Sequence, residues 1–158
     1  MSSSPTRHRV AVVLALVGVA VSAVILHVTR QLTSVEGYTS FCNVSSAVNC
    51  DVVLGSTWST FLGLSVAIWA IGVFGLGALL ALPGAMGATV VGFADLALIG
   101  LAAGSLGFGL VLAGISWLKL HTACLLCMTL DAVIVAWFVT VVPLAGAWSS
   151  ACLNAPAS

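Results

Sequence analysis

Residues 122–148 read TACLLCMTLDAVIVAWFVTVVPLAGAW, an apolar run that opens with two cysteines, Cys124 and Cys127. A membrane-spanning helix needs about 20 mostly apolar residues, and this run exceeds that length. Three further apolar runs of similar character precede it, at about residues 10–28, 60–82 and 88–115. The sequence therefore predicts an all-α integral membrane protein that folds as a bundle of four transmembrane helices.

The composition excludes a water-soluble protein. Hydrophobic residues make up 61% of the chain and charged residues only 5%, whereas a soluble domain carries roughly 25% charged residues. The mean hydropathy is +1.26. The formal net charge of +0 gives no support for nucleic-acid binding. We therefore expect the lipid bilayer as a partner and no nucleic acid, and the length of 158 residues predicts one domain, 1–158.

Polar residues concentrate in one long loop between the first and second apolar runs, at about residues 30–59. Arg7 and Arg9 precede the first run and favour a cytoplasmic N-terminus. Four spans then place the C-terminus on the same side. Arg30 follows the first run where a signal peptide would have a small-residue cleavage site, so we expect an uncleaved span. The loop and the start of the fourth run are then extracytoplasmic, facing the periplasm or the exterior.

Four of the five cysteines form two pairs that this topology places on one side of the membrane. Cys42 and Cys50 lie in the polar loop, while Cys124 and Cys127 begin the fourth run. All four would face an oxidising compartment, whereas Cys152 would face the cytoplasm. Two dithiols can exchange electrons through a mixed disulfide. Plain structural disulfides and a four-thiolate metal site are the alternatives, and we expect no metal because zinc favours short spacing in both pairs.

The local sequence favours a reactive thiol in the second pair. Thr122 is expected to cap the fourth helix, so that both following cysteines lie in its first turns. The positive end of the helix dipole lowers thiol pKa, and His121 and Lys119 add positive charge nearby.

The combined spacing resembles the vitamin K epoxide reductase family. The pattern covers most of the chain and consists of Cys42-x7-Cys50, then Ser56 and Trp58, then Cys124-Leu-Leu-Cys127 on the last of four spans. The resemblance implies a four-helix membrane bundle around a quinone of the menaquinone, ubiquinone or vitamin K type.

The resemblance also implies an order of electron transfer among the four cysteines. Cys42 would pair with Cys50 and receive electrons from a thioredoxin-fold partner. Cys50 would exchange with Cys124, which would pair with Cys127. Cys127 would lie next to the quinone and reduce it.

Ser56, Trp58 and Asp131 are the candidate quinone-binding residues. The resemblance implies that Ser56 helps to hold the quinone. Asp131 lies one helical turn below Cys127 on the same face, and an ionisable residue inside a span is a functional hypothesis by default. A protonated Asp131 could donate a hydrogen bond or a proton to a quinone oxygen, or it could bond to a Ser or Thr of a neighbouring helix. The animal enzymes of the family carry a quinone-contacting tyrosine at this position, and its absence argues against epoxide reduction more than against quinone reduction.

We therefore expect a quinone-dependent thiol–disulfide oxidoreductase that supports disulfide bond formation in a bacterial inner membrane. Bacterial members often carry a fused thioredoxin-like domain after an extra span, whereas this chain stops about ten residues after its fourth span. The thioredoxin-fold partner is therefore expected to be a separate protein. Vitamin K epoxide reductase proper is one alternative, and a non-redox transporter or structural bundle with structural disulfides is another.

Overall fold

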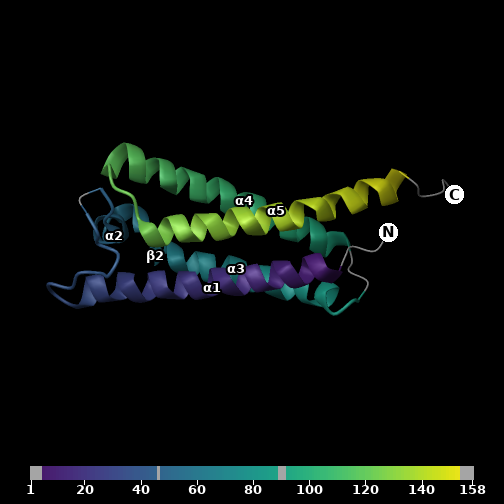
Figure 1. Ribbon diagram of the computed structural model, residues 1–158, viewed down its shortest axis with the longest axis horizontal. Helices are drawn as coiled ribbons and strands as arrows, with labels where there is room; N and C mark the ends of the chain where they lie inside the picture. Colours follow the sequence, from purple (N-terminus) through teal and green to yellow (C-terminus); the bar gives the residue numbers. More distant parts are fainter. Residues whose placement is uncertain (1–4, 46, 89–91, 154–158) are drawn as a thin grey trace.

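Four long helices run side by side along one axis in the computed structural model, which describes residues 5–45, 47–88 and 92–153, with side chains described up to Leu144 (Figure 1). These helices are α1 (Pro5–Ser34), α3 (Val66–Ala85), α4 (Gly92–Ile115) and α5 (Leu125–Leu153). All four are long and apolar enough to cross a membrane. The predicted four-helix membrane bundle is thereby confirmed.

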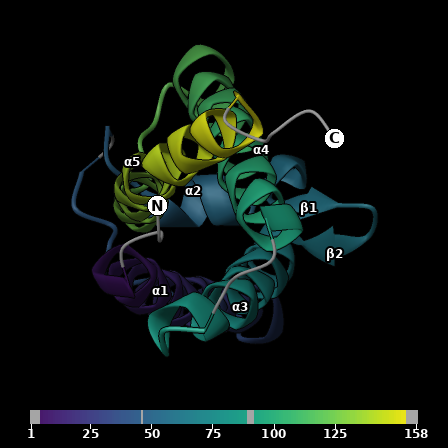
Figure 2. The ribbon, with the colours of Figure 1, turned by 90° about the vertical axis from the view of Figure 1, so that its right-hand side faces the viewer.

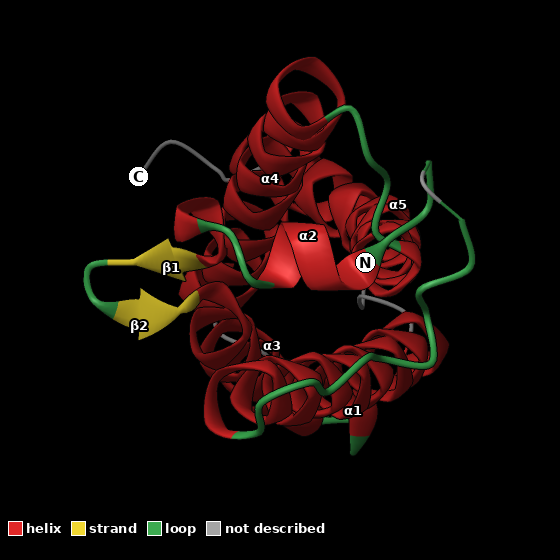
Figure 3. Cartoon of the chain, turned by 90° about the vertical axis from the view of Figure 1, so that its left-hand side faces the viewer, coloured by secondary structure: helices red, strands yellow, loops and turns green. Residues whose placement is uncertain are grey.

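The connection between α1 and α3 covers one end of the bundle. Its short helix α2 (Cys50–Leu54) lies across that end, and a small hairpin of β1 (Thr60–Phe61) and β2 (Leu64–Ser65) projects to one side (Figure 3). A single 3-10 turn, η1 (Thr57–Ser59), joins α2 to the hairpin. The first turns of α1 and the last turns of α5 lie at the opposite end, as the end-on view shows (Figure 2).

The loop predicted at about residues 30–59 is displaced toward the C-terminus. Helix α1 continues to Ser34, and the hydroxyls of Thr29 and Thr33 are accommodated in it by donating to carbonyls of the preceding turn. The second span starts at Val66 and not near residue 60, since Leu62 and Gly63 have φ values of 53° and 78° and form a tight turn.

The remaining span boundaries also differ from those predicted. Helix α3 passes through Pro83 and ends at Ala85, past the predicted end of the second span at about residue 82. A proline is tolerated in a membrane helix where neighbouring groups satisfy the freed backbone carbonyl. Residues 89–91, near the expected start of the third span, lie outside the described part. Helix α4 continues as a π-helical turn, η2 (Ser116–Leu120), and α5 runs to Leu153, past the expected end at 148.

The core divides into two buried clusters along the bundle. One cluster lies between the four long helices and includes Phe74 and Trp137. Helix α3 can approach its neighbours closely here because glycines lie at two of the contact points. A methyl group at Gly18 would come within 2.6 Å of the Phe74 ring, and one at Gly77 would collide with Trp137. The second cluster lies under the loop and contains three of the cysteines.

A buried polar contact joins α1 to α4 at the end of the bundle away from α2. His8 Nε2 and Asp95 Oδ1 are 3.1 Å apart, and both residues are almost fully buried. The imidazole packs directly against Gly84 of α3, where a side chain could not fit. The contact therefore holds three helices together at this end of the bundle, and the two cysteine pairs lie at the opposite end (Figure 1).

Candidate functional site

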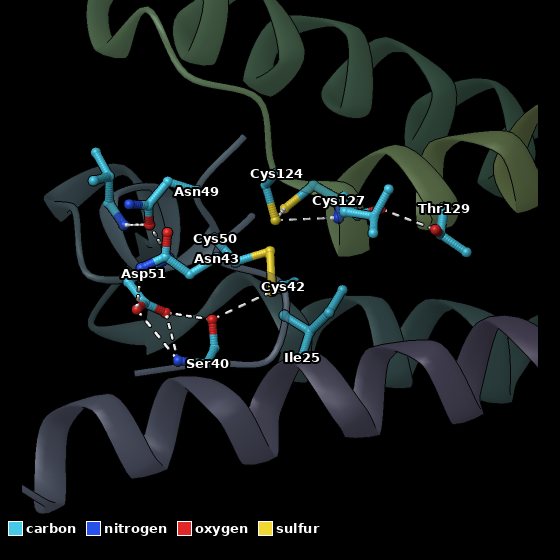
Figure 4. Close-up of a disulfide and its surroundings, with 12 residues drawn as sticks. Ile25, Ser40, Cys42, Asn43, Asn49, Cys50, Asp51, Cys124, Cys127 and Thr129 are labelled. Atoms are coloured by element: carbon cyan, nitrogen blue, oxygen red, sulfur yellow. Dashed lines mark hydrogen bonds between the residues drawn. A yellow bond between two sulfur atoms is a disulfide. The ribbon is translucent and has the colours of Figure 1, made fainter. Parts of the chain in front are cut away.

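Cys42 and Cys50 form a disulfide that is closed off from solvent. Their Cα atoms are 5.7 Å apart, and the residues are 1% and 0% exposed. Cys50 is the first residue of α2, and Asn49 caps that helix by accepting hydrogen bonds from the backbone N–H groups of Asp51 and Val52. The cap fixes the direction in which the Cys50 side chain leaves the helix, so the disulfide has a defined position above the bundle (Figure 4).

The carboxylate of Asp51 holds the loop segment that carries Cys42 against α2. It accepts hydrogen bonds from the backbone N–H and the hydroxyl of Ser40, and a third from Asn43 Nδ2 at 3.3 Å. The Ser40 hydroxyl also lies 3.4 Å from Cys42 Sγ. Segment 40–43 is thus tied to α2 on both sides of Cys42. Neither Ser40 nor Asp51 was singled out from the sequence, although an acidic residue in the first turn of a helix is a recognised signal.

Cys124 and Cys127 lie at the start of α5 with their sulfur atoms 2.7 Å apart and not bonded to each other. The expected cap residue was wrong, because the Thr122 hydroxyl donates to Leu120 O and α5 begins at Leu125. Cys124 occupies the cap position itself. Its sulfur accepts the backbone N–H of Cys127 at 3.3 Å, and its carbonyl accepts from Met128 N.

The capping geometry also acts on the chemistry of the Cys124 thiol. The Cys127 thiol donates a hydrogen bond to the Cys124 sulfur, and this bond, with support from backbone N–H groups, lowers the pKa of Cys124 below its ordinary value despite its burial. The direction matches the expectation from the helix terminus. Cys124 is therefore the better leaving group and the more readily ionised thiol of the inner pair.

Backbone hydrogen bonds bring the two cysteine pairs together. Ala123 donates to Ala47 O at 2.9 Å and accepts from Asn49 N at 3.0 Å, which makes a short parallel bridge between the loop and the residue before Cys124. Cys42, Cys50 and Cys124 consequently share one buried cluster, with Cys127 packed against it. Figure 4 shows the disulfide and the start of α5 side by side.

A cavity of about 390 Å³ opens on the other side of the inner pair. Cys124 and Cys127 both line it, whereas Cys42 and Cys50 do not. The three residues predicted to bind a quinone, Ser56, Trp58 and Asp131, also line it. Small-molecule sites are typically concave, mostly apolar and about 300–1,000 Å³ in volume, so both the size and the apolar lining fit a lipid-soluble ligand.

The polar groups of the cavity wall are few, and most are already engaged. The Ser56 hydroxyl donates to Val53 O at 2.7 Å, so only its lone pairs remain for a ligand. The hydroxyls of Thr29, Ser59 and Ser105 donate in the same way to backbone carbonyls. Asp131 has no hydrogen-bonding or charged partner among the residues that the structure describes.

An aromatic group beside the hairpin completes the wall and was not anticipated from the sequence. Phe61 makes edge-to-face contacts with Trp69 and Phe108, at centroid distances of 6.3 and 5.8 Å. Trp69 Nε1 donates to Phe61 O at 3.2 Å, which ties α3 to the hairpin. The hairpin was hidden in the sequence because its residues are apolar enough to merge with the following span.

These features define an integral membrane protein with two redox-capable cysteine pairs, one of which borders an apolar cavity. The model of the vitamin K epoxide reductase family matches residues 9–142 of the chain. The chain belongs to this family, as its cysteine spacing predicted, and is therefore an oxidoreductase of a family that acts with quinones.

Loss of the Asp51 carboxylate should expose the outer disulfide. Asp51→Asn keeps the size of the side chain but replaces charged acceptors, each worth about 1.5–3 kcal/mol, by a single neutral one. We expect dithiothreitol to reduce Cys42–Cys50 about tenfold faster in this variant, as measured by alkylation and mass spectrometry. Glu36→Gln, which neutralises an exposed carboxylate of the same loop, should leave the rate unchanged. Equal rates in all three proteins would show that Asp51 does not hold the loop closed.

Proposed function

We propose that the protein is a quinone-dependent thiol–disulfide oxidoreductase that supports disulfide bond formation. Electrons pass from a reduced thioredoxin-fold protein to Cys42–Cys50, then to Cys124–Cys127, then to a membrane quinone. The observation that carries the proposal is the position of the inner pair, which shares a buried cluster with the outer disulfide on one side and lines the cavity on the other.

Thiol–disulfide exchange between the pairs needs only the cysteines and their neighbours. The Cys50 thiolate attacks Cys124 of an inner disulfide, an S–S bond forms between them, and Cys127 leaves as a thiolate. Cys42 then attacks Cys50, and Cys124 leaves. The lowered pKa of Cys124 favours this second step, because a less basic thiolate leaves faster. The net result is an oxidised outer pair and a reduced inner pair.

The lining of the cavity supports a quinone as the final acceptor. Trp58, half exposed, and the Phe61 group offer flat apolar contact to a ring, and a protonated Asp131 in the same wall can donate a hydrogen bond to a quinone oxygen. Menaquinone, ubiquinone and vitamin K share this ring chemistry, so the cavity wall fits quinones in general and does not select one of the three.

The burial of the outer disulfide supports a regulated entry for the thiol partner. With Cys42 only 1% exposed, a partner thiolate reaches its sulfur after segment 40–43 leaves α2. The partner as a separate protein, the cytoplasmic termini, the bacterial inner membrane and the extracytoplasmic position of the loop remain predictions from the sequence.

Two other functions are weaker on this geometry. Vitamin K epoxide reductase proper uses the same fold, but Asp131 stands where the animal enzymes carry tyrosine; offering epoxide and quinone side by side would separate the two substrates. A non-redox bundle with structural disulfides leaves unexplained why Cys124 and Cys127 are unbonded thiols on a cavity wall. In the described part of the chain, no three His, Cys, Asp or Glu side chains are grouped to hold a metal ion.

Cys127→Ala should abolish quinone reduction by the purified protein supplied with a reduced dithiol protein. Without Cys127, Cys124 has no partner thiol with which to close a disulfide, so the inner pair cannot give two electrons to the quinone. Cys152→Ala, which removes the cysteine outside both pairs, should retain full activity. Full activity of Cys127→Ala would rule out the proposed electron path.

Cys50→Ala should trap the physiological thiol partner on Cys42. The partner's thiol can still form a mixed disulfide with Cys42 under oxidising conditions, but no intramolecular thiol is present to resolve it. The adduct should be visible on a non-reducing gel and should contain a thioredoxin-fold protein by mass spectrometry. A Cys42→Ala, Cys50→Ala double variant is the control, and an equal yield of adduct from that protein would contradict a partner site at Cys42.

A further inference from the structure

Asp131 is the one carboxyl group in the wall of the cavity, and its surroundings give it no structural task. The other titratable residues of the lining are Cys124 and Cys127 on the same face of α5; the described residues contributed by α1, α2, the hairpin, α3, α4 and η2 carry none. No hydrogen bond or ion pair to Asp131 is present among the described residues. An interhelical hydrogen bond, the structural alternative for this residue, is therefore not what the carboxyl group makes.

The position of Asp131 relative to the inner pair suits proton transfer. It follows Cys127 by four residues, which places it about 6 Å further along the helix axis on the same face. A carboxylate without a partner is costly in an apolar wall, so the neutral acid, which has a proton to donate, is the favoured form. The hydroxyls of Thr29, Ser56, Ser59 and Ser105 are committed to backbone carbonyls. Ser65 and Ser116 also line the cavity, but an alcohol is a far weaker acid than a carboxyl group and is not among the usual general acids.

We propose that Asp131 is a catalytic residue that delivers a proton to the quinone, an inference that rests on the proposed function. Oxidation of the inner dithiol breaks two S–H bonds, forms one S–S bond and releases two electrons and two protons. The quinone accepts both electrons, and the O–H of Asp131 gives its proton to the nearer quinone oxygen. The resulting carboxylate takes up the proton released by Cys127. The proton of Cys124 passes to water, and water in turn gives a proton to the second oxygen of the quinone, which completes the quinol.

Gly109 of α4 is the positioning residue for this carboxyl group. Oδ1 of Asp131 lies so close to α4 that a methyl group at Gly109 would come within 2.7 Å of it. The absence of a side chain at this position therefore lets the carboxyl group lie across the interface between α4 and α5. Gly107, two residues earlier on the same helix, has open space where its side chain would be.

The test is a single-turnover reaction of the full-length, pre-reduced protein with a short-chain benzoquinone, followed by quinol absorbance. Asp131→Asn keeps the shape but cannot carry a proton, and we expect the rate at saturating quinone to fall about 100-fold, as for loss of a general acid. Asp131→Glu should stay within about tenfold of the unaltered protein. Thr129→Val, which alters an exposed residue of the same helix whose hydroxyl bonds only to Leu125 O, is the matched control and should react normally.

Two further readouts separate proton delivery from binding or folding. Electron exchange between the outer and inner pairs should proceed at an unchanged rate in Asp131→Asn, because that step does not involve the quinone. Gly109→Ala should slow quinol formation at least about tenfold by displacing the carboxyl group, whereas Gly107→Ala should not. In an Asp131→Asn background, Gly109→Ala should cause little further loss.

The outcomes distinguish this inference from the function on which it rests. Failure of the unaltered protein to reduce quinone, or full activity of Cys127→Ala, would reject the proposed function itself. An active protein in which Asp131→Asn reacts at the normal rate, or in which only the affinity for quinone changes, would overturn proton delivery by Asp131 and leave the electron path intact.

Discussion

The backbone bridge between the loop and Ala123 is the constraint on which the rest of the site depends. It consists of two hydrogen bonds, from Ala123 N to Ala47 O and from Asn49 N to Ala123 O. Because Ala123 precedes Cys124 and Asn49 precedes Cys50, the bridge brings these two cysteines into one buried cluster. The bridge therefore adds a fixed backbone register to the apolar packing that holds the outer pair against the helices. The caps at Asn49 and Cys124 then orient both side chains from this shared point.

The bundle separates the buried cluster under the loop, which holds the outer disulfide, from the apolar cavity between the helices. The outer disulfide is packed under the loop and borders no part of the cavity, whereas the inner pair borders both. In the proposed electron path, Cys124 therefore connects the outer pair to the cavity. The loop itself is closed by a few polar contacts of Asp51, whose rupture is far easier than unfolding of the helices beneath it. Under the proposed function, a soluble thiol protein would react with the outer pair and a lipid-soluble quinone with the inner pair, without meeting each other.

Most of the architecture could be predicted from apolar run length, because a chain with 5% charged residues has to place its helices in lipid. The cysteine spacing likewise predicted the family. The hairpin could not be predicted, since Phe61, Leu62 and Leu64 are as apolar as the helix that follows, and only the turn at Leu62–Gly63 separates them. The cap of α5 was misassigned to Thr122 because propensity favours threonine, whereas the thiol of Cys124 accepts the N–H instead.

Contacts between distant segments were beyond sequence reasoning. The His8–Asp95 pair joins residues 87 positions apart, and no local pattern links them. The same holds for Asp131 and Gly109, whose close approach depends on how α4 and α5 cross. Composition does show that Asp131 is unusual in a span, but only the packed structure shows that it has no hydrogen-bonding partner among the described residues.

The most direct test of the electron path is the order in which the two disulfides form. Fully reduced protein would be mixed rapidly with a benzoquinone, quenched in acid at intervals, alkylated and analysed by peptide mass spectrometry. The account predicts that Cys124–Cys127 forms first, at a rate that depends on quinone concentration, and that Cys42–Cys50 follows. Formation of Cys42–Cys50 before the inner disulfide, or at an unchanged rate when Cys124 is replaced by alanine, would contradict it.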